Sequence, residues 1–341
     1  MTMHGIYING LANISIQNTF PEPVLESKVA FESNHVRSIE PDFTKYINPV
    51  AIRRMSKIVR RAIATAKKSL EEAQIDMPEA IISGTGLGCI EDTEKFLVSM
   101  IRDNEQFLQP THFIQSTHNT ISSQIAILLK CHGYNSTYAH LGLSFDSALY
   151  DAFLQFKLNQ IKTALVGAYD EMTPAYYELL KKAGNWNGCF AGEGSISIAI
   201  STEKKESTYC SIKDMALFSQ VADGLKLENR IADFLKRNGF SATSIDAVVL
   251  SNSGNAENDA VINDLRHGIF ANSLQITYKN ISGEFYSSSA FGFWLAAIGL
   301  KQQSIPDHLL LNGKVQKPLR NILVHNHSMN KGHSLILLSS C

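Results

Sequence analysis

The chain has 341 residues, of which 44% are hydrophobic and 18% are charged, and its formal net charge is −1. A chain of this length forms either two domains or one large fused core. The near-neutral charge balance excludes a strong electrostatic case for binding nucleic acid or an anionic membrane surface, and the apolar content argues against disorder.

The cysteines and the N-terminus bear on the compartment. Five cysteines are scattered without a CxxC pair, so the sequence predicts neither a zinc knuckle nor a disulfide framework. No histidine pair has the i, i+4 spacing of ligands on one helix face, so no metal site is expected. Residues 1–17 do not resemble a signal peptide, and the longest apolar stretch is too short to span a bilayer. We therefore expect a cytoplasmic protein.

Strand and helix patterns alternate along the chain. Strands are expected at 5–12, 80–83, 137–141, 163–167, 195–201, 210–215, 247–251, 275–277, 321–325 and 334–339. Helices are expected at 52–73, 92–103, 117–130, 145–159, 222–238, 257–268 and 287–301. The polar segment 203–208 is the best boundary, so we expect two similar α/β halves, residues 1–204 and 209–341. This alternation predicts two buried sheets with helices between them.

Several short segments resemble, in chain order, the motifs of one enzyme family. They are Arg53-Arg54-Met55, the glycine-rich turn 84–88, the segment Gly133 to Phe145, Gly192-Glu193-Gly194-Ser195, Lys279 with Ser282-Gly283, and His325 to Leu338. From about Ile52 to its end, the chain resembles the β-ketoacyl synthases, which are condensing enzymes of the thiolase fold. The resemblance implies a thiolase-like α/β fold of two similar halves in a five-layer α-β-α-β-α core, without a cofactor.

A condensing enzyme needs a cysteine thiolate at a helix N-terminus, where the dipole and backbone N–H groups lower the thiol pKa and form an oxyanion hole. The resemblance places that nucleophile position at Gly142, whether one counts forward from Asn135 or back from Ala152. None of the five cysteines lies within ten residues of Gly142. The family-equivalent nucleophile position is therefore a glycine.

The family's two histidine positions also carry other residues. They fall on Ser253 and Glu284, and a carboxylate at the second position would repel a malonyl carboxylate. Only Lys279 is retained, while the final glycine-rich loop departs from the family pattern at residues 328–331. No catalytic set is intact.

The concerted changes predict a synthase-like subunit that does not condense by itself. It resembles the chain-length factor that pairs with an active ketosynthase in type II polyketide systems and lines part of the acyl tunnel. The segment FIQSTHNTISSQIA resembles the synthase-like proteins of bacterial aryl-polyene and flexirubin-type pigment clusters. The implied partners are an active β-ketoacyl synthase, or a second copy of this chain, and an acyl carrier protein, in polyketide or fatty-acid-like biosynthesis.

Some of these residues have a second interpretation. Gly142 is also suited to a tight turn. Ser144 is either an N-cap or the nucleophile of an acyltransferase or thioesterase on the same fold, which could use an activated water instead. A basic helix either receives the acidic carrier protein or is a solvated face; its residues are Arg53, Arg54, Lys57, Arg60 and Arg61.

Further expectations concern the surroundings of this site. Lys279, without its histidine partner, is expected to form an ion pair with a carboxylate such as Glu193 or Glu284. Cys189 is interpreted as a buried small apolar residue rather than a reactive thiol. Four histidines either converge near the pocket or are structural: His118, His140, His325 and His327.

Overall fold

A computed structural model describes residues 5–20, 22, 25, 34–106, 110–186, 188–219, 224–328 and 332–341. Its strands are β1 (Tyr7–Ile14), β2 (Ala80–Gly84), β3 (Tyr134–Tyr138), β4 (Thr163–Asp170), β5 (Gly194–Ser201), β6 (Cys210–Ser219), β7 (Ala247–Leu250), β8 (Leu274–Thr277), β9 (Asn321–Ser328) and β10 (Gly332–Ser339). Its α-helices are α1 (Pro49–Ile52), α2 (Lys57–Glu72), α3 (Ile90–Arg102), α4 (Pro110–Gln115), α5 (Thr120–Leu129), α6 (Ser144–Lys157), α7 (Pro174–Lys182), α8 (Gly224–Arg237), α9 (Ala256–His267), α10 (Lys279–Ser282) and α11 (Ser289–Gln302). In these ranges no helix is long and apolar enough to cross a membrane.

Across the described ranges the strands form one ten-stranded sheet, in the order β3-β2-β4-β5-β1-β6-β10-β9-β7-β8. The first five strands and the last five strands of the chain share one arrangement. When the strands of each set are numbered 1 to 5 along the chain, both sets read 3-2-4-5-1 from the outer edge of the sheet inward. The sets join where β1 pairs with β6, at Tyr7–Ser211 and Ile8–Cys210. The expected two sheets are thus continuous, because β1 pairs with β5 along one edge and briefly with β6 along the other.

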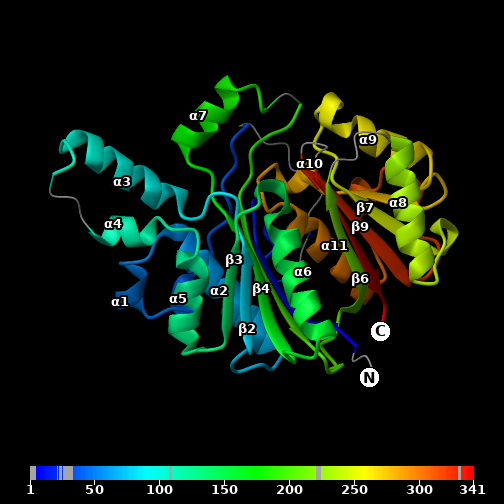
Figure 1. The fold of residues 1–341 in the computed structure, drawn as a ribbon, viewed down its shortest axis with the longest axis horizontal. Coiled ribbons are helices and arrows are strands. Elements are labelled where there is room, and N and C mark those ends of the chain that lie inside the picture. The colour runs from blue at the N-terminus through cyan, green and yellow to red at the C-terminus, as the bar shows by residue number, and fades with distance from the viewer. Residues whose placement is uncertain are drawn as a thin grey trace.

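Alternating side chains divide the core into layers. Ile82 of β2 and Val324 of β9 belong to the central core, whereas their neighbours Ile81 and Leu323 belong to the two outer cores. Helices α6 and α11 fill the centre, α2 and α5 cover the first set of strands, and α8 and α9 cover the second (Figure 1). The fold is therefore the expected five-layer, thiolase-like α-β-α-β-α core.

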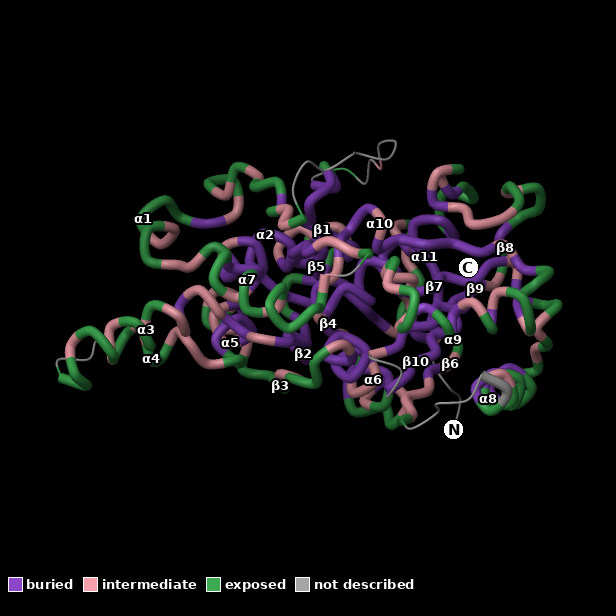
Figure 2. The backbone as a smooth tube through the Cα atoms, turned by 90° about the horizontal axis from the view of Figure 1, so that it is seen from above, coloured by how far each residue is buried: buried purple, intermediate pink, exposed green. Residues whose placement is uncertain are grey.

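Helix α11 shows why this layering follows from the sequence. Every residue from Ser289 to Leu300 is buried, which is the pattern of a helix enclosed on all sides. Figure 2 shows buried backbone concentrated along the sheet and α11, whereas α3 and α4 extend away from it with exposed segments. The buried centre of the molecule is therefore the sheet together with the enclosed helix α11.

Some element boundaries differ from those expected. The helix predicted at 52–73 begins at Lys57, after the short α1, and the one predicted at 117–130 begins at Thr120, after α4. The strand predicted at 137–141 lies at 134–138, because its parallel pairing with β2 starts at Tyr134 and Leu141 adopts a positive φ of 48°. Helix α7 was not predicted, although Thr173 caps it and Pro174 occupies its first turn.

A buried ion network links α2 to the loop before β5. The Arg61 side chain is 3% exposed, and its Nη2 lies 2.5 Å from Glu40 Oε1 and 2.9 Å from Glu193 Oε1. Glu193 also accepts hydrogen bonds from the backbone N–H groups of Ser38 and Met172. The prediction that Arg61 belongs to a carrier-binding or solvated basic face was therefore wrong, because its buried guanidinium forms ion pairs with Glu40 and Glu193.

Replacing Arg61 with methionine should lower the free energy of unfolding by about 3–5 kcal/mol, because the buried Glu193 carboxylate then lacks its cation. Chemical denaturation followed by circular dichroism measures this change. The matched control Arg53→Met alters an exposed position and should change the same free energy by less than about 0.5 kcal/mol. Equal, small effects of both substitutions would contradict the structural role of the network.

Candidate functional site

A cavity lies where the two halves of the sheet bring their parallel strands together. β3, β2 and β4 are parallel, as are β8, β7 and β9, and ligands of α/β sheets bind at the carboxyl ends of such strands. Residues after β3, β4, β7 and β8, and at the end of β9, line a cavity of about 260 Å³. Both halves of the chain therefore contribute to one site.

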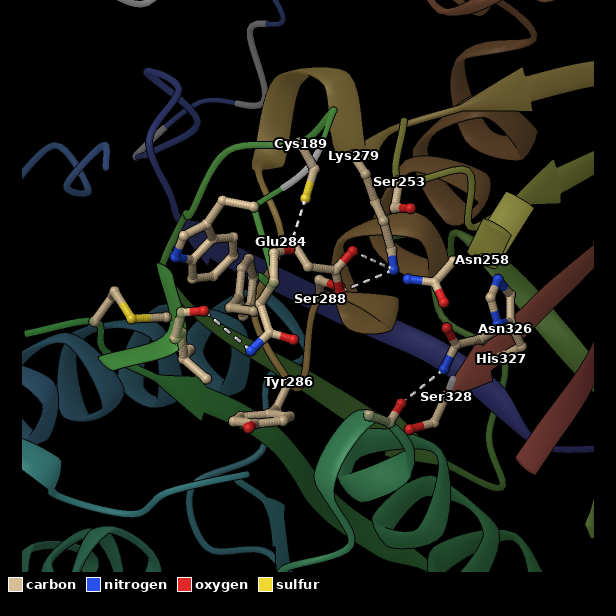
Figure 3. A pocket seen from close by; sticks show the side chains of 16 residues that line it. Cys189, Ser253, Asn258, Lys279, Glu284, Tyr286, Ser288, Asn326, His327 and Ser328 are labelled. Carbon is tan, nitrogen blue, oxygen red and sulfur yellow. Dashed lines mark hydrogen bonds and ion pairs between the residues drawn. The ribbon is translucent and has the colours of Figure 1, made fainter. Parts of the chain in front are cut away.

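The structure brings together the four residues that the resemblance places at the reactive positions. Gly142, Ser253, Lys279 and Glu284 all line this cavity, and Figure 3 labels the last three. Apolar side chains form another part of the lining, here called the apolar wall: Met172, Leu180, Trp186, Phe285 and Tyr286. The site can thus hold a ligand with an extended apolar part and a polar end.

Gly142 lies in the tight turn that precedes α6. Its carbonyl oxygen accepts a hydrogen bond of 2.9 Å from Asn326 Nδ2 of β9. A Cβ atom at this position would lie 2.7 Å from Ser328 Oγ and 2.9 Å from Ser328 Cβ. The start of α6 is therefore packed against the end of β9 in a way that leaves little room for any side chain at residue 142.

Ser144, the alternative nucleophile, lies beside this turn but does not line the cavity. Its hydroxyl is buried, accepts a hydrogen bond of 2.8 Å from the His140 backbone N–H and donates one of 2.7 Å to the Leu141 carbonyl. Both contacts hold the turn closed at the start of α6. In this structure Ser144 stabilises the turn.

Lys279 forms an ion pair with Glu284, the residue that the resemblance places at the second histidine position. Lys279 Nζ lies 2.7 Å from Glu284 Oε2 and 3.0 Å from Glu284 Oε1. The lysine side chain is 6% exposed and the glutamate side chain 30%. Of the two carboxylates expected as partners for Lys279, Glu284 is therefore the one it contacts.

Ser253 is fixed by a carboxylate on α9. Its hydroxyl donates to Asp259 Oδ1 at 3.0 Å, and its backbone N–H donates to the same oxygen at 2.8 Å. The next residue, Gly254, donates its N–H to Asp259 Oδ2 at 2.8 Å. With its proton directed at Asp259, the Ser253 hydroxyl presents only lone pairs to other groups.

Backbone contacts between glycines join loops of the two halves around the cavity. Gly188 and Gly254 both have positive φ, and a Cβ on Gly188 would lie 2.3 Å from the Gly254 carbonyl oxygen. Nearby, Gly192 donates its N–H to the Glu284 carbonyl, and Glu284 donates its N–H to the Phe190 carbonyl. The segment that carries Cys189 and the segment that carries Glu284 are therefore held together.

Cys189 lines the cavity, contrary to its interpretation as a buried apolar residue, and its side chain is half-buried. Its thiol donates a long hydrogen bond of 3.4 Å to the Asn185 carbonyl. Burial and the nearby Glu284 carboxylate raise the pKa of this thiol to about 11, against the opposing influence of Lys279. Cys189 is therefore a protonated thiol at neutral pH.

The histidines do not converge in the cavity as a set. Of the four named in the sequence, only His327 lines it; His325 is fully buried behind it, and His140 contacts Ser147 at the surface. Burial, together with Lys279 and His333, lowers the pKa of His327 to about 3, so its imidazole is neutral. In the described ranges no cluster of three His, Cys, Asp or Glu side chains is arranged to hold a metal ion.

The residues proposed for carrier binding lie apart from the cavity. Arg53 and Arg54, in the turn between α1 and α2, and Lys57, the first residue of α2, are exposed. Arg60 donates to the Met55 carbonyl and is half-buried. The exposed basic face is therefore narrower than the sequence indicated.

Sequence reasoning missed several lining residues. Asn258 and Asn326 are single polar residues inside otherwise regular elements, so no spacing marks them. Leu180 and Trp186 belong to α7 and the loop after it. The Thr173-Pro174 start and the Lys181-Lys182 end of α7 were the signals that could have found this wall.

A family model matches most of the chain. The profile described as "Beta-ketoacyl synthase, N-terminal domain" matches residues 29–230, which is more than half of the chain. The chain therefore belongs to the β-ketoacyl synthase family. Among curated proteins, no sequence match is found.

Solved structures share the fold over the full length. The ishigamide ketosynthase/chain length factor is similar with a TM-score of 0.80 and 15% identity, covering 100% of both chains. A β-ketoacyl synthase from Burkholderia phymatum STM815 is similar with a TM-score of 0.77 and 12% identity, over 99% of this chain and 100% of the other. AntDE:AntF (apo), a type II polyketide acyl-carrier protein in complex with its ketosynthase bound to the hexaketide, gives 0.75 and 13%, covering 100% of both.

The neutral His327 should make stability fall in acid. Its pKa is about 3 in the folded chain against an ordinary value near 6.5, so between these values the unfolded chain binds the extra proton. Stability is therefore lost as pH falls from 7.5 to 5, by about 2 kcal/mol for this residue. The free energy of unfolding in urea is measured at pH 7.5 and at pH 5. Its loss between these pH values should be smaller by that amount in His327→Gln than in the wild type.

The control for this measurement is His132→Gln, because His132 is exposed in the folded chain. His132→Gln should lose as much unfolding free energy between the two pH values as the wild type does. If His327→Gln also loses as much as the wild type, the buried imidazole does not set the acid sensitivity.

Proposed function

We propose that this chain is a ketosynthase-like subunit that does not condense by itself and acts as the chain-length-factor-type partner of an active β-ketoacyl synthase. The observation that carries the proposal is that Gly142, Ser253 and Glu284 meet in one cavity with Lys279. Each of these positions lacks the group that condensation needs, and they lie where the family's reactive groups would act together. Its function would be indirect: it stabilises its partner and helps to shape the space that holds the growing acyl chain.

The chemistry of the lining supports the absence of a condensing step in this chain. Among the described lining residues, the only thiol is Cys189, whose raised pKa keeps it protonated, and it lies on a loop rather than at the start of a helix. The only imidazole there, that of His327, stays neutral. A weakly ionised thiol is a poor nucleophile towards a thioester.

The proposed partners are an active synthase and an acyl carrier protein. Two structures of the same fold support this choice, one of a ketosynthase/chain length factor and the other of an acyl-carrier protein in complex with its ketosynthase. The exposed Arg53, Arg54 and Lys57 would supply positive charge for an acidic carrier. The proposed complex of this chain with an active synthase would act in polyketide or fatty-acid-like biosynthesis.

The partner role is tested by purifying the tagged chain from its native host and weighing the intact complex by native mass spectrometry. The expected result is a one-to-one complex with a ketosynthase that carries an intact Cys-His-His set. Recovery of a homodimer without any synthase would contradict the proposal.

The variant Gly142→Cys should not gain malonyl condensation. A Cβ at residue 142 already crowds Ser328, and the positions of the two histidines still hold Ser253 and Glu284. Product formation from malonyl and acyl carrier thioesters should stay at the wild-type background. Gly142→Ala is the matched control, since it introduces the same crowding without a thiol, and robust condensation by Gly142→Cys would refute the account.

A further inference from the structure

The two charged side chains of the described cavity lining, Lys279 and Glu284, are paired with each other. In the described lining, Lys279 is the only cation at neutral pH and Glu284 the only carboxylate. Both oxygens of the carboxylate lie within hydrogen-bond distance of the ammonium, at 2.7 and 3.0 Å. Figure 3 shows the two side chains pointing toward each other, with Ser253 and Asn258 on one side and Cys189 on the other.

We propose that Glu284 is a built-in counter-ion that occupies the place a ligand carboxylate would take on Lys279, so that the cavity accepts uncharged acyl groups and rejects those ending in a carboxylate. This inference rests on the proposed function in one respect, namely that the cavity receives an acyl group. It adds a specificity-determining residue and the class of acyl group.

The backbone on both sides keeps Glu284 in place. Its N–H donates to the Phe190 carbonyl at 2.8 Å, and its own carbonyl accepts from Gly192 at 3.1 Å. Gly283, the preceding residue, has a φ of +70°. A Cβ atom at this position would lie only 2.6 Å from the Gly192 backbone nitrogen, so the two segments are in close contact. A tethered carboxylate has a high effective concentration at its partner, so a free carboxylate competes poorly for it.

Charge balance gives the same result. Lys279 and Glu284 neutralise each other, and the other polar groups of the lining that Figure 3 labels are hydroxyls, amides, a thiol and a neutral imidazole. An anionic ligand entering the cavity would lose its hydration and meet the Glu284 carboxylate without gaining a free cation. An uncharged carbonyl or alkyl group meets no such penalty, and the apolar wall favours it.

The test compares two probes of nearly the same shape, the malonyl and acetoacetyl thioesters of N-acetylcysteamine, which differ by a carboxylate oxygen in place of a methyl group. Dissociation constants are measured by ligand-observed NMR on the wild type and on Glu284→Gln. The wild type should bind the acetoacetyl probe at least tenfold more tightly than the malonyl probe. In Glu284→Gln the malonyl probe should bind at least tenfold more tightly than in the wild type, while the acetoacetyl probe changes less than threefold.

The control is the double variant Lys279→Met/Glu284→Gln, which removes the cation as well and should abolish the gain in malonyl binding. If Glu284→Gln does not fold, the wild-type preference still decides, because malonyl binding as tight as acetoacetyl binding would overturn the inference. The inference would also be overturned if Glu284→Gln changed the dissociation constants of both probes by the same factor, or if neither probe bound to any variant. Loss of the synthase partner role would leave the difference between the probes intact, so the two proposals fail separately.

Discussion

The site depends on the close contact of backbone segments from the two halves of the chain. Gly188 meets Gly254, and Gly192 meets the segment 282–284, at distances that leave no space for a Cβ atom. Three of these glycines, Gly188, Gly254 and Gly283, also adopt positive φ, which other residues rarely tolerate. Because these contacts fix the loops at the ends of β5, β7 and β8, residues more than a hundred positions apart form one cavity.

Within that cavity, burial and ion pairing act on the reactive groups that are present. A thiol, an imidazole, a lysine and a carboxylate are all present, a set that would permit acyl transfer if arranged and ionised for it. The thiol and the imidazole are held in their neutral forms, and the two charged groups neutralise each other. These states support the proposal that the chain holds an acyl group without transforming it and works through a partner.

The local alternation of strand and helix patterns predicted two buried sheets with helices between them, and the resemblance to the synthases supplied the five-layer arrangement. Gly142, Ser253, Lys279 and Glu284 were named by their resemblance to family motifs, and these four residues line one cavity. Arg61 and Cys189 were misjudged, because burial by segments remote in sequence leaves no local pattern. The wall formed by α7 was missed although its cap signals were present, because no strand pattern required a helix there.

The central claim is that this chain binds an acyl group without forming a bond to it. The most direct measurement is the intact mass of the purified chain after incubation with an acyl carrier thioester, followed by peptide mapping. The account predicts an unmodified mass, with the acyl group still on the carrier protein. An acyl adduct at Ser144 or Cys189 would contradict it and identify this chain as an acyltransferase or thioesterase built on the synthase fold.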